Sequence, residues 1–141
     1  MSNENLWCFE LADKIFTYVK TVATHSLIDE FPNIFFTQSS INEGNAKYPT
    51  IYIHELPGSE VGQDLVNETI NAIDYNMQVE VITDNTQEDA RVVVAEIADI
   101  FKGMGFNLKQ FPTFDNSITE YRTIMRVGRV IGKGNINSLF K

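Results

Sequence analysis

The chain has 141 residues, of which 43% are apolar and 21% are charged. Such a chain is typical of one globular domain, which can bury about two-thirds of the surface that it exposes when unfolded. Its single cysteine, Cys8, excludes an internal disulfide, and the apolar residues around it favour an inert, buried thiol. A net charge of −8 disfavours binding to nucleic acid or to anionic lipid.

The polar N-terminal residues lack a basic region followed by an apolar run, so we expect no signal peptide. No apolar stretch approaches the ~20 residues of a membrane span, and we expect a protein that is made and used in a cytoplasm. Charge is unevenly distributed along the chain. Acidic residues dominate from 55 to 99, whereas the last stretch is mainly basic and contains Arg122, Arg126, Arg129, Lys133 and Lys141.

The first half of the chain predicts one helix and two strands. Apolar residues recur at three- and four-residue steps over residues 5–26, which predicts an amphipathic helix that ends before Pro32. A short aromatic strand is expected at 33–38, a polar loop at 39–47 and a second strand at 48–56. Residues 57–67 have no clear period and predict a long projecting connection, with a short helix as the alternative.

The second half begins with an alternating strand over residues 69–83, in which one face is apolar and the other polar. A helix follows at 86–102, capped by Thr86 and stopped by Gly103. A strand at 106–111 ends at Pro112, a turn covers 113–116, and a long strand covers 117–131, where Gly128 is a candidate for a β-bulge. Residues 132–141 are predicted to be a flexible tail that a partner could order.

These elements follow the order α-β-β-β-α-β-β. We therefore predict an α+β fold with a mostly antiparallel sheet of about four to five strands and two helices packed on one face. Residues 1–141 form a single domain in this prediction, with a core over about 5–131.

Chemical motifs are scarce, and we expect no catalytic, metal-binding or cofactor-binding residues. His25 and His54 have no ligand-type residue at a suitable spacing and are predicted to be exposed to solvent. The glycines of 128–134 are followed by no helix, as a phosphate loop would require. The carboxylates of 84–89 lack the spacing of a calcium loop and are explained by helix capping.

Possible contact surface is more abundant. Phe111 and Phe114 flank a proline in the predicted turn, and Val61 and Leu65 lie on the predicted connection. Clustered exposed apolar residues mark interaction sites. The alternative is that these residues fold back over the edge of the sheet.

Three segments together carry a resemblance to a known family. They are the strand Tyr48-Pro49-Thr50-Ile51-Tyr52-Ile53, the strand end Val79-Glu80-Val81-Ile82-Thr83-Asp84, and the helix end Phe101-Lys102-Gly103-Met104-Gly105-Phe106. With the long connection and the capped helix between them, this order resembles the tail-terminator and tail-completion proteins of long-tailed bacteriophages. The resemblance extends from about Leu6 to Ile131.

The resemblance implies a virion structural protein rather than an enzyme, located at the neck where tail and head join. Identical subunits would form a ring, expected to be a hexamer, that caps the tail tube and offers a surface to the head–tail connector or stopper protein. DNA would pass through the lumen without specific binding, and assembly would take place in the host cytoplasm. Val61, Asp64 and Leu65 would reach toward a neighbouring subunit or the tube.

A ring requires two different patches of one subunit to meet. We expect Arg122 or Arg126 to contact carboxylates of a neighbouring subunit. Two alternatives remain open, namely another neck protein such as a head-completion or stopper subunit, and a monomeric bacterial binding module without catalysis. An enzyme would need a pocket with converging polar groups, which the sequence does not predict.

Overall fold

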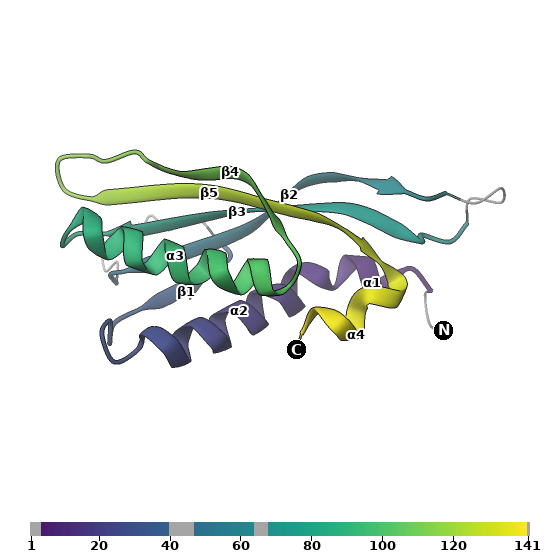
Figure 1. Cartoon of the computed structure of the whole chain (residues 1–141), viewed down its shortest axis with the longest axis horizontal. Helices are drawn as coiled ribbons and strands as arrows, with labels where there is room; N and C mark the ends of the chain where they lie inside the picture. Colours follow the sequence, from purple (N-terminus) through teal and green to yellow (C-terminus); the bar gives the residue numbers. More distant parts are fainter. Residues whose placement is uncertain (1–3, 40–46, 64–67, 141) are drawn as a thin grey trace.

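The computed structural model describes residues 4–39, 47–63 and 68–140. Their fold is α+β, as predicted, with a mostly antiparallel five-stranded sheet and four α-helices. Helices α2 and α3 lie side by side against one face of the sheet (Figure 1). The elements are α1 (Leu6–Phe9), α2 (Leu11–Leu27), β1 (Phe35–Thr37), β2 (Thr50–Val61), β3 (Ala72–Thr83), α3 (Gln87–Gly103), β4 (Asn107–Phe114), β5 (Tyr121–Gly132), the 3-10 turn η1 (Lys133–Asn135) and α4 (Ile136–Leu139).

The strand order is β1-β2-β3-β5-β4. β2–β3, β3–β5 and β5–β4 pair antiparallel, whereas β1 and β2 are parallel. Strands that directly follow one another in the chain are expected to pair antiparallel, and β1 and β2 depart from that expectation. The segment between them is long enough to return the chain to the end at which β1 started, as parallel pairing requires.

The core lies between the sheet and the two long helices. Alternate residues of β2, β3 and β5 face the helices, and their register places Ile53, Val79 and Met125 across from one another. The predicted inward face of β3 is confirmed, since Tyr75, Met77, Val79 and Val81 are buried. Both helices bury an apolar stripe against this face, composed of Leu11, Ile15, Val19, Ala23 and Leu27 in α2 and Ala90, Val93, Val94, Ile97, Ile100 and Phe101 in α3.

The predicted N-terminal helix is divided in two at Glu10, which ends α1 and precedes α2. Asn5 explains the direction of α1. Its side-chain amide donates to the carbonyl of Glu68 at 3.1 Å and accepts from the amide of Ile70 at 2.8 Å. These bonds tie α1 to the chain that enters β3, so α1 follows that chain rather than the axis of α2.

Two strands extend further than predicted. Each prediction ended its strand at a proline, whereas the strand in the structure continues through it. β2 continues through Pro57 to Val61, with a register shift between Leu56 and Ser59, so the projecting connection predicted from residue 57 onward is shorter. β4 continues through Pro112 to Phe114, also with register shifts. Irregular pairing and edge position both remove the need for a backbone donor at proline.

Gly128 does not form the predicted bulge, because it pairs regularly with Asn76 in β3. In the β4–β5 pair, the register shifts lie further along β4, between Leu108 and Gln110 and between Gln110 and Thr113. A Cβ at Gly128 would lie 2.1 Å from Asn76 Oδ1, so the glycine makes room for the side chain of the opposite residue.

The predicted flexible tail is wrong for residues 132–140, which continue β5 and then form η1 and α4. Leu139 is only 1% exposed. The ring of Phe140 lies 5.2 Å from that of Tyr18 in α2. These apolar contacts fold the segment back onto the domain, whereas residue 141 lies outside the described residues.

Candidate functional site

The second face of the sheet is a candidate interaction surface. All helices of the described residues lie on the other side of the sheet (Figure 1). Register and alternation place polar and apolar side chains on this open face, among them Tyr52 and His54 of β2, Gln78, Glu80 and Ile82 of β3, and Arg122, Ile124, Arg126 and Val130 of β5.

A paired charge cluster lies within the open face. Glu80 is only 5% exposed and is the one charged residue that is buried in the described part of the chain. Its carboxylate accepts hydrogen bonds from the guanidinium of Arg122, through Nε and Nη2, and from Gln78 Nε2 at 2.9 Å. His54 Nε2 lies 3.6 Å from Oε2 of Glu80, and the ring of Tyr52 stacks on that of His54 at 4.5 Å. Such contacts compensate for the loss of water around a buried carboxylate.

This cluster corrects the prediction that His54 is exposed to solvent. The side chain is 26% exposed and lies between Tyr52 and Glu80. Sequence reasoning missed the pair because Glu80 is 26 positions further along the chain than His54. The two side chains meet only through the β2–β3 register, which places His54 opposite Gln78. His25 is exposed, as predicted.

The two arginines that are expected at a subunit contact differ in whether a carboxylate of their own chain compensates their charge. Arg122 contacts Glu80 and lies 3.6 Å from Asp115, so its charge is compensated within its own chain. Arg126 is exposed, and its Nε donates to the neutral Gln78 at 2.9 Å. No carboxylate of the described residues lies within 4.0 Å of Arg126.

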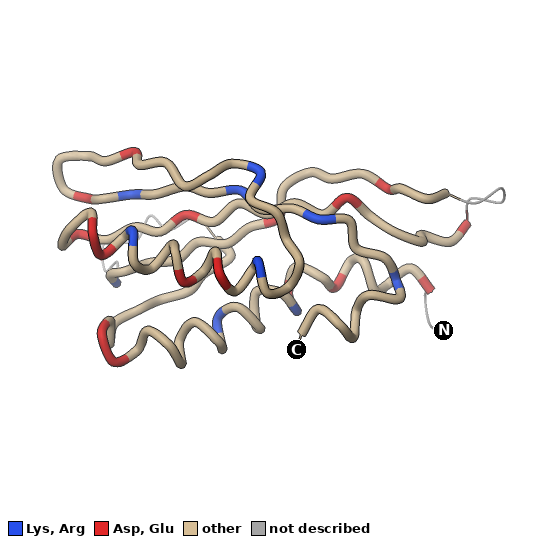
Figure 2. The backbone as a smooth tube through the Cα atoms, in the orientation of Figure 1, with Lys and Arg blue, Asp and Glu red and all other residues tan. Residues whose placement is uncertain are grey.

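Figure 2 shows how charge is distributed over the fold. Acidic positions gather at the end where the β4–β5 hairpin and the start of α3 lie, and others lie toward the opposite ends of β2 and β3, whereas basic positions are spaced along β5. At the acidic end Glu30, Asp84 and Asp89 line one groove of about 280 Å³. Tyr48, also in this groove, donates to Glu120 at 2.5 Å. This bond, with partial burial and the charges of Glu120 and Asp84, raises the pKa of Tyr48 to about 12.

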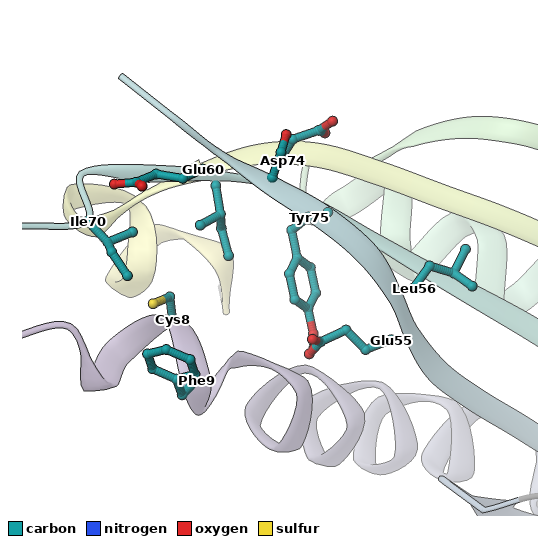
Figure 3. Close-up of a pocket in the computed structure, with 11 residues that line it drawn as sticks. Cys8, Phe9, Glu55, Leu56, Glu60, Ile70, Asp74 and Tyr75 are labelled. Carbon is teal, nitrogen blue, oxygen red and sulfur yellow. The ribbon is translucent and has the colours of Figure 1, made fainter. Parts of the chain in front are cut away.

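A second cavity, of about 280 Å³, lies between α1 and the distal part of β2 and β3. Figure 3 shows the ring of Tyr75 pointing into it toward Glu55, while Asp74 points away. The phenol of Tyr75 donates to Glu55 at 3.0 Å, and burial, followed by the charge of Glu55, raises its pKa. Cys8 is half-buried here, and desolvation raises the pKa of its thiol, which disfavours the reactive thiolate.

No metal site or membrane-spanning element is found in the described residues. They contain no group of three or more His, Cys, Asp or Glu side chains placed to hold an ion. None of their helices combines the length and apolarity needed to cross a membrane. The carboxylates near the start of α3 accompany a helix cap, in which Thr86 Oγ1 accepts from the amide of Asp89 at 3.1 Å.

The predicted contact residues are dispersed. Val61 is half-buried at the end of β2, and Asp64 and Leu65 lie outside the described residues. Phe111 and Phe114 belong to β4 rather than to a turn. Phe111 is 74% exposed, whereas Phe114 packs against the core with its ring 5.5 Å from the guanidinium carbon of Arg91. Of the two phenylalanines, Phe114 folds back against the core, as the alternative prediction has it, and Phe111 does not.

Sequence reasoning missed Ile118, which is fully exposed. The sequence predicts a final strand over 117–131, but β5 begins at Tyr121. The chain turns at 117–120, where the amide of Ser117 donates to the carbonyl of Glu120 at 2.9 Å. The polar run Asp115-Asn116-Ser117 was the available signal for a later turn.

This chain matches no known protein-family model and no curated protein sequence. A proposal for its function therefore has to be argued from the fold and from the surfaces described above.

Proposed function

We propose that this chain is a structural subunit of a phage virion, a tail-terminator or tail-completion protein. Identical copies form a ring, a hexamer by the family resemblance, which caps the tail tube and joins it to the head–tail connector. The partners are a second copy, the tube protein and the connector or stopper protein. The role requires no catalytic centre or cofactor.

The observation that carries the proposal is the open face of the sheet. A monomeric α+β domain that covers only one face of its sheet leaves the other to water or to a partner. Here the open face contains half-buried Tyr52, Ile82 and Ile124, together with the exposed side chain of Val130. Mixed apolar and paired polar surface of this kind is typical of protein interfaces.

The charge distribution supports a contact between unlike patches. An acidic end and a basic segment on one subunit favour head-to-tail association, which closes into a ring when the rotation between copies allows it. The net charge of −8 is also compatible with a lumen through which DNA passes without being bound.

Solution mass tests this proposal most directly. Light scattering coupled to size exclusion, across a range of concentrations, is expected to show closed multiples of the 16.0 kDa subunit. Electron microscopy of that fraction should show rings, and the rings should bind purified tail tubes at one end. Rings that bind connector but no tube would favour another neck protein. A strict monomer at every concentration would overturn the ring.

The cavity beneath α1 favours a monomeric binding module as the second candidate. Glu55 and Glu60 line it with Tyr75, Phe9 and Ile70, and no Lys or Arg is among the described residues that line it. Acidic and aromatic groups together recognise organic cations. A thermal-shift screen with small amines would support this module if stabilisation depends on Glu55, and would count against it if Glu55→Gln responds like the wild type.

A further inference from the structure

The tip of the β4–β5 hairpin presents an apolar side chain on a fixed turn. Beyond the bond from Ser117 to Glu120, Ser117 Oγ accepts from the amide of Glu120 at 3.1 Å, and the amide of Asp115 donates to the carbonyl of Arg122 at 2.8 Å. These bonds hold the fully exposed Ile118 between two acidic residues, Asp115 and Glu120. A single exposed isoleucine is ordinary on a surface, but here its position is fixed and its neighbours are charged.

A groove with the opposite character lies on the open face. It is about 580 Å³ in volume, and the described residues that line it are Leu56, Pro57, Asp74, Asn76, Lys109 and Arg126. The register shift between Leu56 and Ser59 bends β2 at its wall. Lys109 and Arg126 have no carboxylate of the described residues within 4.0 Å, and Asp74 is the only acidic residue among the described residues that line the groove.

The tip cannot fill its own groove. The tip precedes Tyr121. The groove lies near Gly128, because Asn76, which pairs with Gly128, is one of the residues that line the groove. Seven residues of extended strand separate the two points by about 23 Å. Any contact between tip and groove therefore joins two copies, and because the two patches differ, it repeats from copy to copy.

We propose that the β4–β5 tip of one copy docks into the Lys109–Arg126 groove of the next, with Ile118 against Leu56 and Pro57 and the tip carboxylates beside the two cations. The occupant is a second copy of this chain, selected by charge complementarity. This contact rests on the proposed self-assembling function and specifies its interface. It also narrows the sequence-based expectation, since Arg126 makes the contact while Arg122 holds its own Glu80.

Disulfide trapping tests the contact. In a Cys8→Ser background, Ile118→Cys and Pro57→Cys are prepared as separate proteins, one with a mass tag. Mixed under mild oxidation, they are expected to give the mixed disulfide dimer in several-fold excess over the disulfide homodimer that either variant gives alone. A chain with both cysteines should give a ladder that ends at the covalent ring. Ser26→Cys, exposed on α2, replaces Ile118→Cys in the control and should give no excess of mixed dimer.

Charge reversal provides an independent measurement. Lys109→Glu with Arg126→Glu is expected to weaken self-association at least tenfold, and Asp115→Lys in the partner chain should restore part of it. Lys102→Glu with Lys133→Glu makes the same change of charge at exposed positions outside the groove and should have a smaller effect.

The outcomes separate the two proposals. A wild-type oligomer that yields no mixed disulfide dimer and is insensitive to charge reversal in the groove would overturn the tip–groove contact and leave the ring standing. A wild-type chain that remains monomeric and gives no mixed dimer would overturn both. Mixed dimers no more abundant than in the Ser26→Cys control would also count against the contact.

Discussion

Among single residues, Glu80 shows how a charge can be buried on a sheet face that no helix of the described residues covers. Arg122, Gln78 and His54 surround its carboxylate, and each comes from a different position in the three central strands. Breaking a buried ion pair costs more than the pair contributes, because the remaining charge has lost its water. The cluster is therefore a structural constraint on β2, β3 and β5.

Arg122→Met is expected to lower the free energy of unfolding by about 2 kcal/mol, since it leaves the Glu80 carboxylate buried without its cation. Arg126→Met is the matched control, and because Arg126 is exposed and donates to the neutral Gln78, we expect a change within about 0.5 kcal/mol. Urea denaturation measures both. The double variant Glu80→Gln with Arg122→Met should recover stability, and equal effects of the two arginine variants would contradict the prediction.

Tyr48 predicts a response to alkaline pH. Its pKa of about 12 exceeds the ordinary value of about 10, so the bond to Glu120 stabilises the fold fully below pH ~10 and is lost as the pH rises through about 12. The phenolate absorbance that Tyr48→Phe removes from the titration should therefore rise near pH 12. In Glu120→Gln this component should move toward pH 10. An unchanged component would show that Glu120 is not the cause.

At the level of elements, the end of α3 is fixed by Gly105 rather than by the predicted Gly103. Gly105 has φ +86°, and its amide donates to the carbonyl of Lys102 at 3.0 Å. The amide of Phe106 donates to the carbonyl of Phe101 at 3.0 Å, and their rings pack edge to face at 5.1 Å. This is a Schellman motif, with its hydrophobic contact, and it directs the chain into β4.

Gly105→Ala is expected to destabilise the protein by about 1–2 kcal/mol, because alanine is strained at positive φ. Gly103→Ala should be neutral or stabilising by up to about 1 kcal/mol, since Gly103 is helical and nothing lies within 4 Å of the position of a Cβ. Thermal or urea unfolding measures this pair of variants. A larger loss of stability in Gly103→Ala than in Gly105→Ala would indicate that Gly103, as predicted from the sequence, ends the helix.

The C-terminal segment behaves as an element of the core. Leu139→Ala should cost about 2–3 kcal/mol of stability, because it leaves a cavity where α4 meets the domain. Asn137→Ala, exposed on the same short helix, should be nearly neutral. Hydrogen exchange of the β5 end should accelerate only in the Leu139 variant, and an unaffected Leu139→Ala would support the sequence-based prediction of a loose tail.

On the scale of the whole molecule, the separation of charge matters more than its total. The acidic hairpin end and the groove cations lie on different parts of one subunit, which favours association with defined polarity. Because these groups are exposed, salt should screen their attraction within a Debye length of about 8–10 Å.

Self-association measured by light scattering should therefore weaken as salt rises from low to physiological concentration. The Lys109→Glu and Arg126→Glu variant should have lost most of this dependence, because it lacks the cations that are screened. Association that strengthens with salt would point instead to apolar contacts, such as Phe111 and Val130, as the main attraction.

Local pattern by itself determined much of this protein. The strict alternation of β3 identified its buried face, and Thr86 identified the start of α3, because side-chain period and capping depend only on near neighbours. The α+β class followed from the order of such segments.

Only the tertiary structure decided which distant residues meet. Strand register brings Arg122 and His54 to Glu80 and leaves Arg126 without a carboxylate of the described residues, although both arginines lie on one face of β5. The parallel β1–β2 pair, the strands that continue through Pro57 and Pro112, and the burial of Leu139 likewise depend on contacts between remote segments. Free energy gained from those contacts overrides the local signals of turn, proline and chain end.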